Sequence, residues 1–533
     1  MSTTEGRLDR ENPDDLLNAR LDPSGSAFGT HGGEAGSDLN WFKMVRARVA
    51  ERAASSSRYR WWVLWALLTG LFSLNFTFTV FIVALPKVAG EFHTNVTILT
   101  WTMVGPLLAY GLAAPVLGKT GDIFGHRRLY LLGLVGAVVS AVLTALAPNV
   151  ITLLLARTLD GIQGAATGTA SGAIVNMVFS KEERVKAMGW WSLIGAGGPV
   201  IGVSVGSPII AAFGWRALFW FQCVLLIMAI VVVAAILPRT RDSDEEKAKA
   251  RAEFRRMDWI GSWTLSLSVS TLMLGLSLGS IAGWSSWIVV SSFVVCALGL
   301  VAFIVRITTA ENPLIPAQYF RTRNFVWPMV VRACGNFAYF GAFFMFPLLM
   351  EQGFGYSIAA VGGLAVFRPI TFSLCSPIAG YVAMRIGERR SAIIGTFALF
   401  SSLALFAALS SNSGAWVVAI ALSLSGFGMG VAMPSSSSVM ASAVKTSEFG
   451  VMSAAQMLAM QVGEVAGIQT LETVQQALVH RRHLTDALPG PELLATFRWP
   501  FIIGAAVGLV GFAASFLMRS VPRPTREAAA TRG

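Results

Sequence analysis

Apolar runs of about twenty residues recur along most of this chain, and an α-helix needs that length to cross the hydrocarbon core of a bilayer. Of the 533 residues, 54% are hydrophobic and only 13% are charged, whereas a typical soluble domain is about one quarter charged. A helix satisfies its backbone hydrogen bonds within itself, and such long apolar runs exclude a membrane β-barrel. The sequence therefore predicts an all-α polytopic membrane protein.

Hydropathy indicates about fourteen spans, an even number that places both termini on one side of the membrane. The first six are predicted at residues 61–84, 98–118, 128–147, 151–175, 188–211 and 217–237. The other eight are predicted at residues 258–280, 287–306, 326–350, 358–381, 391–410, 415–435, 450–472 and 498–518. Lys and Arg concentrate in alternate connections. Because such connections stay inside the cell, both termini are predicted to be cytoplasmic and the protein to lie in the cell (inner or plasma) membrane.

The same charge distribution explains the net charge of +12, so nucleic acid is not an expected partner. Composition also divides the chain into parts with different character. The predicted parts are a mostly disordered basic tail at 1–60, a six-helix half at 61–237, a charged cytoplasmic linker at 238–257, an inserted two-helix hairpin at 258–306, a second six-helix half at 307–518 and a cytoplasmic tail at 519–533.

A short basic connection between the second and third spans reads G-K-T-G-D-I-F-G-H-R-R over residues 118–128. Its glycines allow close backbone approach, its aspartate can bind helix-terminal amides or a cation, and its arginines hold it on the cytoplasmic face. This spacing suggests a contact that is made and broken during a conformational cycle. The predicted gating residues are Gly118, Gly121, Asp122, Gly125, Arg127 and Arg128.

A partial repeat of this connection, G-Y-V-A-M-R-I-G-E-R-R, lies at residues 380–390. It indicates two related halves, with the hairpin at 258–306 between them. Internally repeated halves that rock about a site near the midplane are common in secondary transporters.

Arg157 and Asp160 lie inside the fourth predicted span, where an ionisable group is costly unless it is paired or faces water. Their spacing of three places them on one helical face, so they can pair. Two readings stay open. The pair is either static, or Asp160 exchanges a proton while Arg157 tunes its proton affinity.

Three more charges lie within predicted spans, namely Arg332, Arg368 and Glu464. An ion pair between Glu464 and Arg368 would be a structural explanation. Otherwise Glu464 is a second protonatable carboxylate, and Arg332 or Arg368 faces an anionic substrate.

The chain resembles the major facilitator superfamily, specifically its fourteen-helix drug:proton antiporter family. The connection at 118–128 is similar to the superfamily's loop between helices two and three, although Ile123 and His126 stand where basic residues are usual. The fourth span reads A-R-T-L-D-G-I-Q-G over residues 156–164 and is similar to the motif R-x-x-Q-G-x-G, with Asp160 in place of the usual glutamine.

The fifth span is similar to the antiporter motif G-P-x-x-G-G, with Val203 in place of the last glycine. The resemblance implies that this motif favours export over uptake. A Gly-Pro pair within a helix permits a kink and close helix contact, and ordinary small-residue packing is the alternative. The motif residues are Gly195, Gly198, Pro199 and Gly202.

The first span lacks the carboxylate that the family usually carries. The family pattern D-x-T-I-V-N-V-A-L-P is similar to T-F-T-V-F-I-V-A-L-P at residues 77–86, so Thr77 stands at the aspartate. Asn75 offers only a neutral hydrogen bond. The candidates for a substrate cavity are therefore Asn75, Thr77, Arg332 and Arg368, and those for proton coupling are Asp160, Arg157 and Glu464.

These observations predict a secondary active transporter that exports amphipathic small molecules by proton-coupled alternating access, as in multidrug efflux and drug resistance. Its partners would be a small-molecule or lipid-like substrate, protons and membrane lipids, with the chain acting as a monomer. One alternative is an exporter or flippase of a dedicated envelope lipid or anionic secondary metabolite. A second alternative is a non-transporting membrane sensor or scaffold of the same fold.

Neither a cofactor nor an enzyme activity is expected from the sequence. The four cysteines, at 223, 296, 334 and 375, lie in apolar runs without CxxC spacing or histidine partners, so we interpret them as core residues rather than metal ligands. No nucleotide-binding glycine loop or Ser-His-Asp set is evident.

Overall fold

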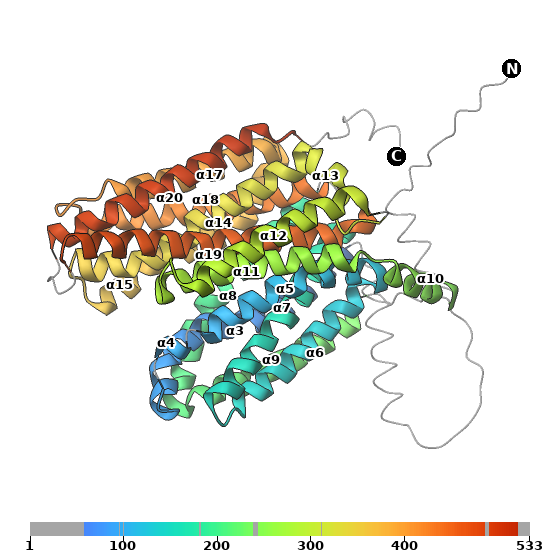
Figure 1. Ribbon diagram of the computed structural model, residues 1–533, viewed down its shortest axis with the longest axis horizontal. Helices are drawn as coiled ribbons and strands as arrows, with labels where there is room; N and C mark the ends of the chain where they lie inside the picture. The colour runs from blue at the N-terminus through green and yellow to red at the C-terminus, as the bar shows by residue number, and fades with distance from the viewer. Residues whose placement is uncertain are drawn as a thin grey trace.

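The computed structural model describes residues 58–94, 96–99, 101–180, 183–237, 244–310, 312–484 and 490–520. These residues are almost entirely helical and contain no strand (Figure 1). Eleven of the described helices are long and apolar enough to cross a membrane. The prediction of an all-α polytopic membrane protein is confirmed. Most of the two tails expected at 1–60 and 519–533 lies outside the described residues, namely 1–57 and 521–533, and so does the start of the linker, 238–243.

Among the described residues, fourteen long helical segments occupy the fourteen predicted positions. The predicted first half contains α3 (Tyr59–Glu91), α5 (Trp101–Phe124), α6 (His126–Ala145), α7 (Val150–Val178), α8 (Arg184–Phe213) and α9 (Trp215–Ile236). The predicted hairpin contains α11 (Trp259–Ala282) and α12 (Trp287–Thr309). The predicted second half contains α14 (Arg323–Leu348), the pair α15 (Ile358–Ala365) and α16 (Phe367–Ile386), α17 (Glu388–Ala407), α18 (Ala415–Ala441), α19 (Phe449–Arg481) and α20 (Pro491–Leu517).

Local sequence signals explain several helix boundaries. Asn149 caps α7, where its side chain accepts a hydrogen bond from the backbone N–H of Thr152 at 2.9 Å, as an N-cap residue should. The tenth predicted span is two helices rather than one, divided at Val366. Pro369 lies in the first turn of α16 and has no N–H to bond to the carbonyl of Ala365, which favours an interruption here.

The two related connections of the sequence have the same backbone conformation. Gly125 precedes α6 with φ of 95°, and Gly387 precedes α17 with φ of 97°. Only glycine adopts this left-handed region without strain. The repeat in the sequence therefore corresponds to a repeated structural turn, one in each half.

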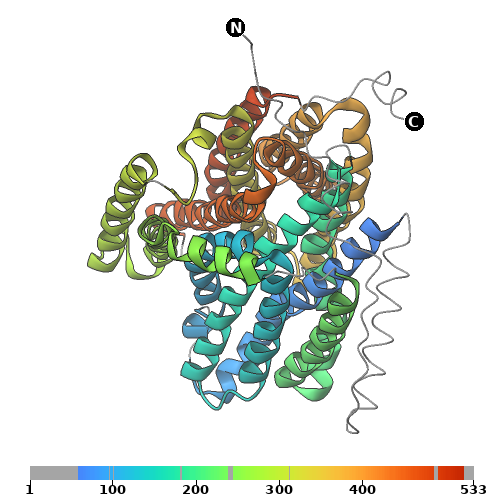
Figure 2. The ribbon, with the colours of Figure 1, turned by 90° about the vertical axis from the view of Figure 1, so that its right-hand side faces the viewer.

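The shorter helices lie at the ends of the bundle. Helix α10 (Asp244–Arg255) belongs to the predicted linker and packs on the end of α5, where the rings of Phe254 and Phe124 are 5.1 Å apart. Helix α13 (Ala317–Arg321) lies just before α14, and α4 (Val96–Leu99) follows α3. In Figures 1 and 2 the hairpin of α11 and α12 lies on the outside of the bundle, and α11 packs against α5 and α19.

The two halves approach each other at one end of the bundle and diverge towards the other (Figure 1). They converge at the end that holds α10, α13 and the connection at 118–128, here called the gate end, and diverge towards α4 and α15. The halves pack through α5 on α19 and through α8 on α16. Hydrogen bonds between the halves lie towards the gate end, among them one from Ser376 to the carbonyl of Gly189 at 2.9 Å.

Candidate functional site

Asp122 joins the two halves at the gate end. This residue lies in the last turn of α5, and its carboxylate accepts hydrogen bonds from the backbone N–H groups of Gly450 at 2.7 Å and Val451 at 3.0 Å. Both amides belong to the first turn of α19 in the other half. The first N–H groups of a helix have no partner within it and carry the positive end of the helix dipole, so a carboxylate binds them well. Asp122 therefore acts as a cap supplied by the opposite half, with its side chain only 3% exposed.

The helices α5 and α19 come close because both carry a glycine at the crossing. A β-carbon at Gly118 would lie 2.7 Å from the carbonyl oxygen of Gly450 and 2.8 Å from the β-carbon of Ala454. A β-carbon at Gly450 would lie 2.8 Å from the Asp122 carboxylate. Such distances are far below van der Waals contact, so larger residues would force the halves apart.

His126 and Arg127 form hydrogen bonds within the first half. His126 is 7% exposed and donates from Nε2 to the Asp122 carboxylate at 3.1 Å. Arg127 donates to the carbonyl groups of Leu237 at 3.0 Å and Ala234 at 3.2 Å, which tie the start of α6 to the end of α9. Arg128 is exposed on the first turn of α6. Asp122 thus contacts the other half through side-chain hydrogen bonds, and Gly118 permits the close approach.

A second polar cluster surrounds Asp160 in the middle of α7. Arg157 forms an ion pair with one carboxylate oxygen, and Gln163 donates to the other at 3.0 Å. Ser140 of α6 donates to that same oxygen. The guanidinium group of Arg157 also lies over the rings of Phe81 and Phe219, with centroid distances of 5.4 and 5.7 Å, which favours the cation.

The pair between Arg157 and Asp160, one of the two readings of their spacing, is therefore formed in this conformation. Arg157 is 2% exposed, and its Nε has no hydrogen-bond partner within the described residues. An arginine held by two rings and one carboxylate loses most of its stabilisation if that carboxylate becomes neutral. Protonation of Asp160 would therefore release Arg157 to move.

The first-span candidates do not provide a carboxylate or a free amide. Thr77 is 1% exposed. Asn75 uses its Nδ2 to donate to the carbonyl of Leu71 at 2.8 Å, within its own helix. Within the described part of the chain, neither Thr77 nor Asn75 forms a hydrogen bond with Arg157 or Asp160.

Two buried arginines in the second half carry unsatisfied donors. Arg332 is 3% exposed and has no hydrogen bond to its Nε among the described residues. Arg368 is 1% exposed and lies 3.6 Å over the ring of Tyr339, whose carbonyl it also binds. Its Nε and Nη1 lack partners among the described residues.

The ion pair considered between Arg368 and Glu464 is not formed. Arg368 points to the ring and carbonyl of Tyr339 instead. Glu464 is 9% exposed, and within the described residues no ion pair or hydrogen bond to it is found. The ring and the backbone carbonyl of Tyr339, on α14, lie directly beside Arg368 and take the place that the Glu464 carboxylate would have in an ion pair.

The antiporter motif lies inside α8, between Arg184 and Phe213. The side-chain placement of Gly195, Gly198, Pro199 and Gly202 falls outside what the structure describes. The expected bend at this motif therefore stays a prediction.

Sequence reasoning did not identify several residues that complete these clusters. Gln163 and His126 are three and four positions from the aspartates that they bind, so helical spacing would have found them. Ser140, Gly450 and Tyr339 come from other helices or distant segments. No local pattern in the sequence indicates these three contacts.

Comparison with known proteins agrees with this architecture. The family model described as Major Facilitator Superfamily matches residues 67–468. The chain is 25% identical over 416 residues to the multidrug transporter protein MdtP of Bacillus subtilis (strain 168), covering 77% of this chain and 75% of that protein. It is 26% identical over 434 residues to the tetracenomycin C resistance and export protein of Streptomyces glaucescens, covering 81% and 79%.

Solved structures share the fold. The human organic anion transporter MFSD10 (TETRAN) is similar with a TM-score of 0.61 and 17% identity, covering 86% of this chain and 100% of that chain. The proton:xylose symporter XylE is similar with a TM-score of 0.58 and 12% identity, covering 84% and 95%.

Proposed function

The chain belongs to the Major Facilitator Superfamily, and on this premise we propose that it is a secondary active transporter that exports amphipathic small molecules, drugs among them, in exchange for protons. The relatives named above are a multidrug transporter and an antibiotic resistance and export protein, which supports this substrate class. The gate end is the cytoplasmic end in this proposal, with both termini cytoplasmic and the chain working as a monomer.

The observation that carries the proposal is the contact from Asp122 to the first turn of α19. It joins the two halves through hydrogen bonds that water can replace, as does the bond from Ser376 to the carbonyl of Gly189. A transporter working by alternating access needs such a contact on each side, closed in one state and broken in the other. The described conformation is then the one closed to the cytoplasm.

The proton step is assigned to Asp160. Its carboxylate holds Arg157, Ser140 and Gln163 when ionised, so protonation would break up a cluster that spans α6 and α7. The proton would then bind one of the two transport conformations more tightly than the other. Coupling of transport to protons requires such a difference in affinity. Glu464, buried and unpaired within the described residues, is the second carboxylate available for this role.

Reconstituted protein tests the proposal. Purified wild-type protein in proteoliposomes is given an inward-directed proton gradient and a fluorescent amphipathic cation, with a protonophore as the control. Gradient-dependent movement of the cation that the protonophore abolishes is the expected result. Movement of no tested substrate under any gradient would favour the non-transporting sensor or scaffold.

The two buried arginines favour a second candidate, export of anionic amphiphiles or lipid-like metabolites. Arg332 and Arg368 have unsatisfied donors in the membrane region, where a cation is stabilised by an anionic partner. This candidate predicts that the same proteoliposomes move an anionic amphiphile and leave the cation in place.

A further inference from the structure

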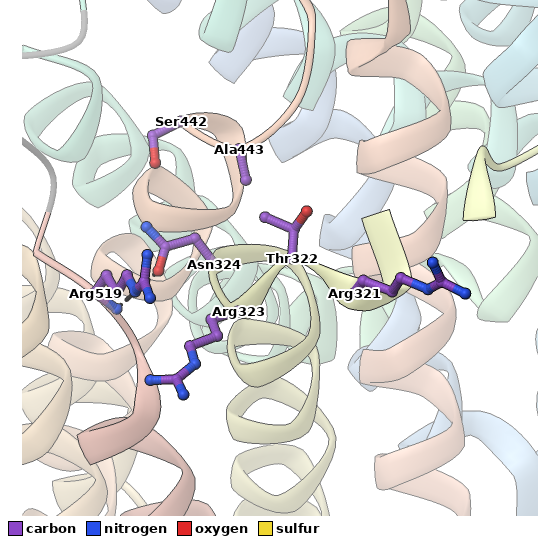
Figure 3. A pocket seen from close by; sticks show the side chains of 7 residues that line it. All are labelled: Arg321, Thr322, Arg323, Asn324, Ser442, Ala443 and Arg519. Atoms are coloured by element: carbon purple, nitrogen blue, oxygen red, sulfur yellow. Dashed lines mark hydrogen bonds between the residues drawn. The ribbon is translucent and has the colours of Figure 1, made fainter. Parts of the chain in front are cut away.

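A pocket of about 460 Å³ opens at the gate end of the second half. It lies between the short connection from α13 to α14, the two residues that follow α18, and Arg519, two positions beyond the end of α20 (Figure 3). Its polar lining consists of three arginines, one asparagine and two hydroxyl residues, and no acidic residue takes part. The arginines are Arg321, Arg323 and Arg519. None of its lining residues belongs to the clusters around Asp122 and Asp160.

The charge in the pocket is not compensated. All three arginines are exposed, and no ion pair to any of them is found within the described residues. In Figure 3, Arg323 and Arg519 lie on one side together with Asn324, whereas Arg321 extends to the opposite side. The Asn324 side chain is fixed by a hydrogen bond of 2.7 Å from the backbone N–H of Arg519 to its Oδ1. Its Nδ2 therefore remains a donor.

The position of the pocket at the ends of membrane helices indicates which kind of ligand it binds. Arg323 is the first residue of α14, and Arg519 follows the end of α20 at Leu517. Both arginines thus stand where apolar helices leave the bilayer, at the level of the lipid headgroups. Guanidinium groups bind phosphate oxygens through paired N–H donors, and basic pockets between membrane helices on the cytoplasmic side suit anionic headgroups.

We propose that this pocket is a binding site for a phosphate-type anion, held by Arg323 and Arg519 with the Nδ2 of Asn324 as a neutral donor. The phosphate belongs either to the headgroup of an anionic lipid or to a soluble phosphate compound. The site is separate from the transported substrate. All of its lining residues belong to the second half, so it moves as one body, and its occupancy does not depend on the contact between Asp122 and Gly450.

Native mass spectrometry of the full-length protein in neutral detergent tests this proposal, with phosphatidylglycerol as the probe and phosphatidylcholine as the reference lipid. The test variant is Arg323→Gln/Arg519→Gln. The matched control is Arg255→Gln/Arg256→Gln, which removes the same charge from two exposed arginines at the end of α10. We expect phosphatidylglycerol to bind about fivefold more weakly for each pocket arginine removed and about thirtyfold for both. The control should bind as the wild type does.

Competition with inorganic phosphate identifies the source of the anion. Displacement of the lipid by millimolar phosphate assigns the pocket to soluble phosphate compounds as well, and retention of the lipid assigns it to headgroups. Equal binding by the pocket and control variants would overturn the proposal.

A second variant distinguishes loss of lipid binding from loss of folding. Arg519→Gln alone leaves the backbone hydrogen bond to Asn324 in place, so it is expected to fold. If the arginines only complement the negative ends of α18 and α20, this variant lowers the unfolding temperature and leaves lipid binding unchanged, which would also overturn the proposal.

Discussion

The backbone N–H of Gly450 donates a 2.7 Å hydrogen bond to the carboxylate of Asp122, although 328 positions separate the two residues in the sequence. The bond joins the end of a helix in one half to the start of a helix in the other. It forms because α19 begins at the point where α5 ends, and because Gly118 and Gly450 let the two helices touch. The state closed at the gate end is therefore stabilised by a few specific atoms, and single substitutions should shift it.

Asp122→Asn should open the gate end. The amide has no charge to offer the helix dipole, and we expect the closed state to lose about 1.5 kcal/mol, or about tenfold in population. Spin labels at the exposed positions Leu132 of α6 and Arg390 of α17, in a background without native cysteines, would report the separation of the halves. An unchanged distance distribution would show that Asp122 does not hold the halves together.

Gly118→Ala should have the same effect through sterics. The added β-carbon would lie 2.7 Å from the Gly450 carbonyl oxygen, so α5 and α19 must separate. The control is Gly362→Ala in α15, where an added β-carbon meets nothing within 4 Å. Transport should fall in Gly118→Ala and persist in Gly362→Ala. Equal transport in both variants would contradict the close approach of the two helices.

Tyr319 gives a prediction about pH. It lies in α13, outside the membrane-spanning helices, and its hydroxyl donates to the carboxylate of Glu448, just before α19. Burial and this hydrogen bond raise the pKa of Tyr319 from 10.0 to about 12. The folded protein therefore holds the proton more tightly than the unfolded chain does. The stabilisation of the folded state by this proton is complete below pH 10 and is lost as the pH rises towards 12.

Tyr319→Phe removes this titration and tests it. Thermal unfolding at about pH 8 and about pH 11, on either side of the ordinary tyrosine pKa, should show a larger fall in midpoint for wild type than for the variant. Other groups that titrate in this range are common to both proteins and cancel in the comparison. An equal fall in both would show that the Tyr319 proton contributes nothing.

Arg332→Gln separates the two candidate substrate classes. If the unsatisfied guanidinium group of Arg332 binds an anionic substrate, its removal should raise the KM for an anionic amphiphile about tenfold or more. Transport of a cationic amphiphile should change little. The control is Arg255→Gln on the exposed face of α10. Equal kinetics for the anion in wild type and Arg332→Gln would exclude this residue from the substrate path.

The sequence determines the helices more fully than the contacts between them. Hydropathy places the spans because the bilayer requires long apolar helices, and the glycines of the two related connections identify turns that the structure repeats at Gly125 and Gly387. The partner of Arg157 also follows from helical spacing. These features depend on a few neighbouring residues and can be read locally.

Contacts between distant segments could not be predicted in this way. Nothing near Asp122 indicates Gly450, and nothing near Asp160 indicates Ser140. Of the two alternatives for Arg368 and Glu464, the ion pair is not formed in this conformation, because Arg368 lies over the ring of Tyr339 instead. Which groups meet across a bundle depends on helix rotation and tilt, and hydropathy does not determine either.

The most direct test of proton-coupled export compares wild type with Asp160→Asn in two assays on the same proteoliposomes. One measures substrate accumulation driven by a proton gradient, and the other measures counterflow of labelled against unlabelled substrate without a gradient. We expect Asp160→Asn to lose accumulation and keep counterflow, because alternating access survives while its link to the proton is broken. Gradient-driven accumulation at the wild-type rate in Asp160→Asn would contradict the assignment of the proton step to Asp160.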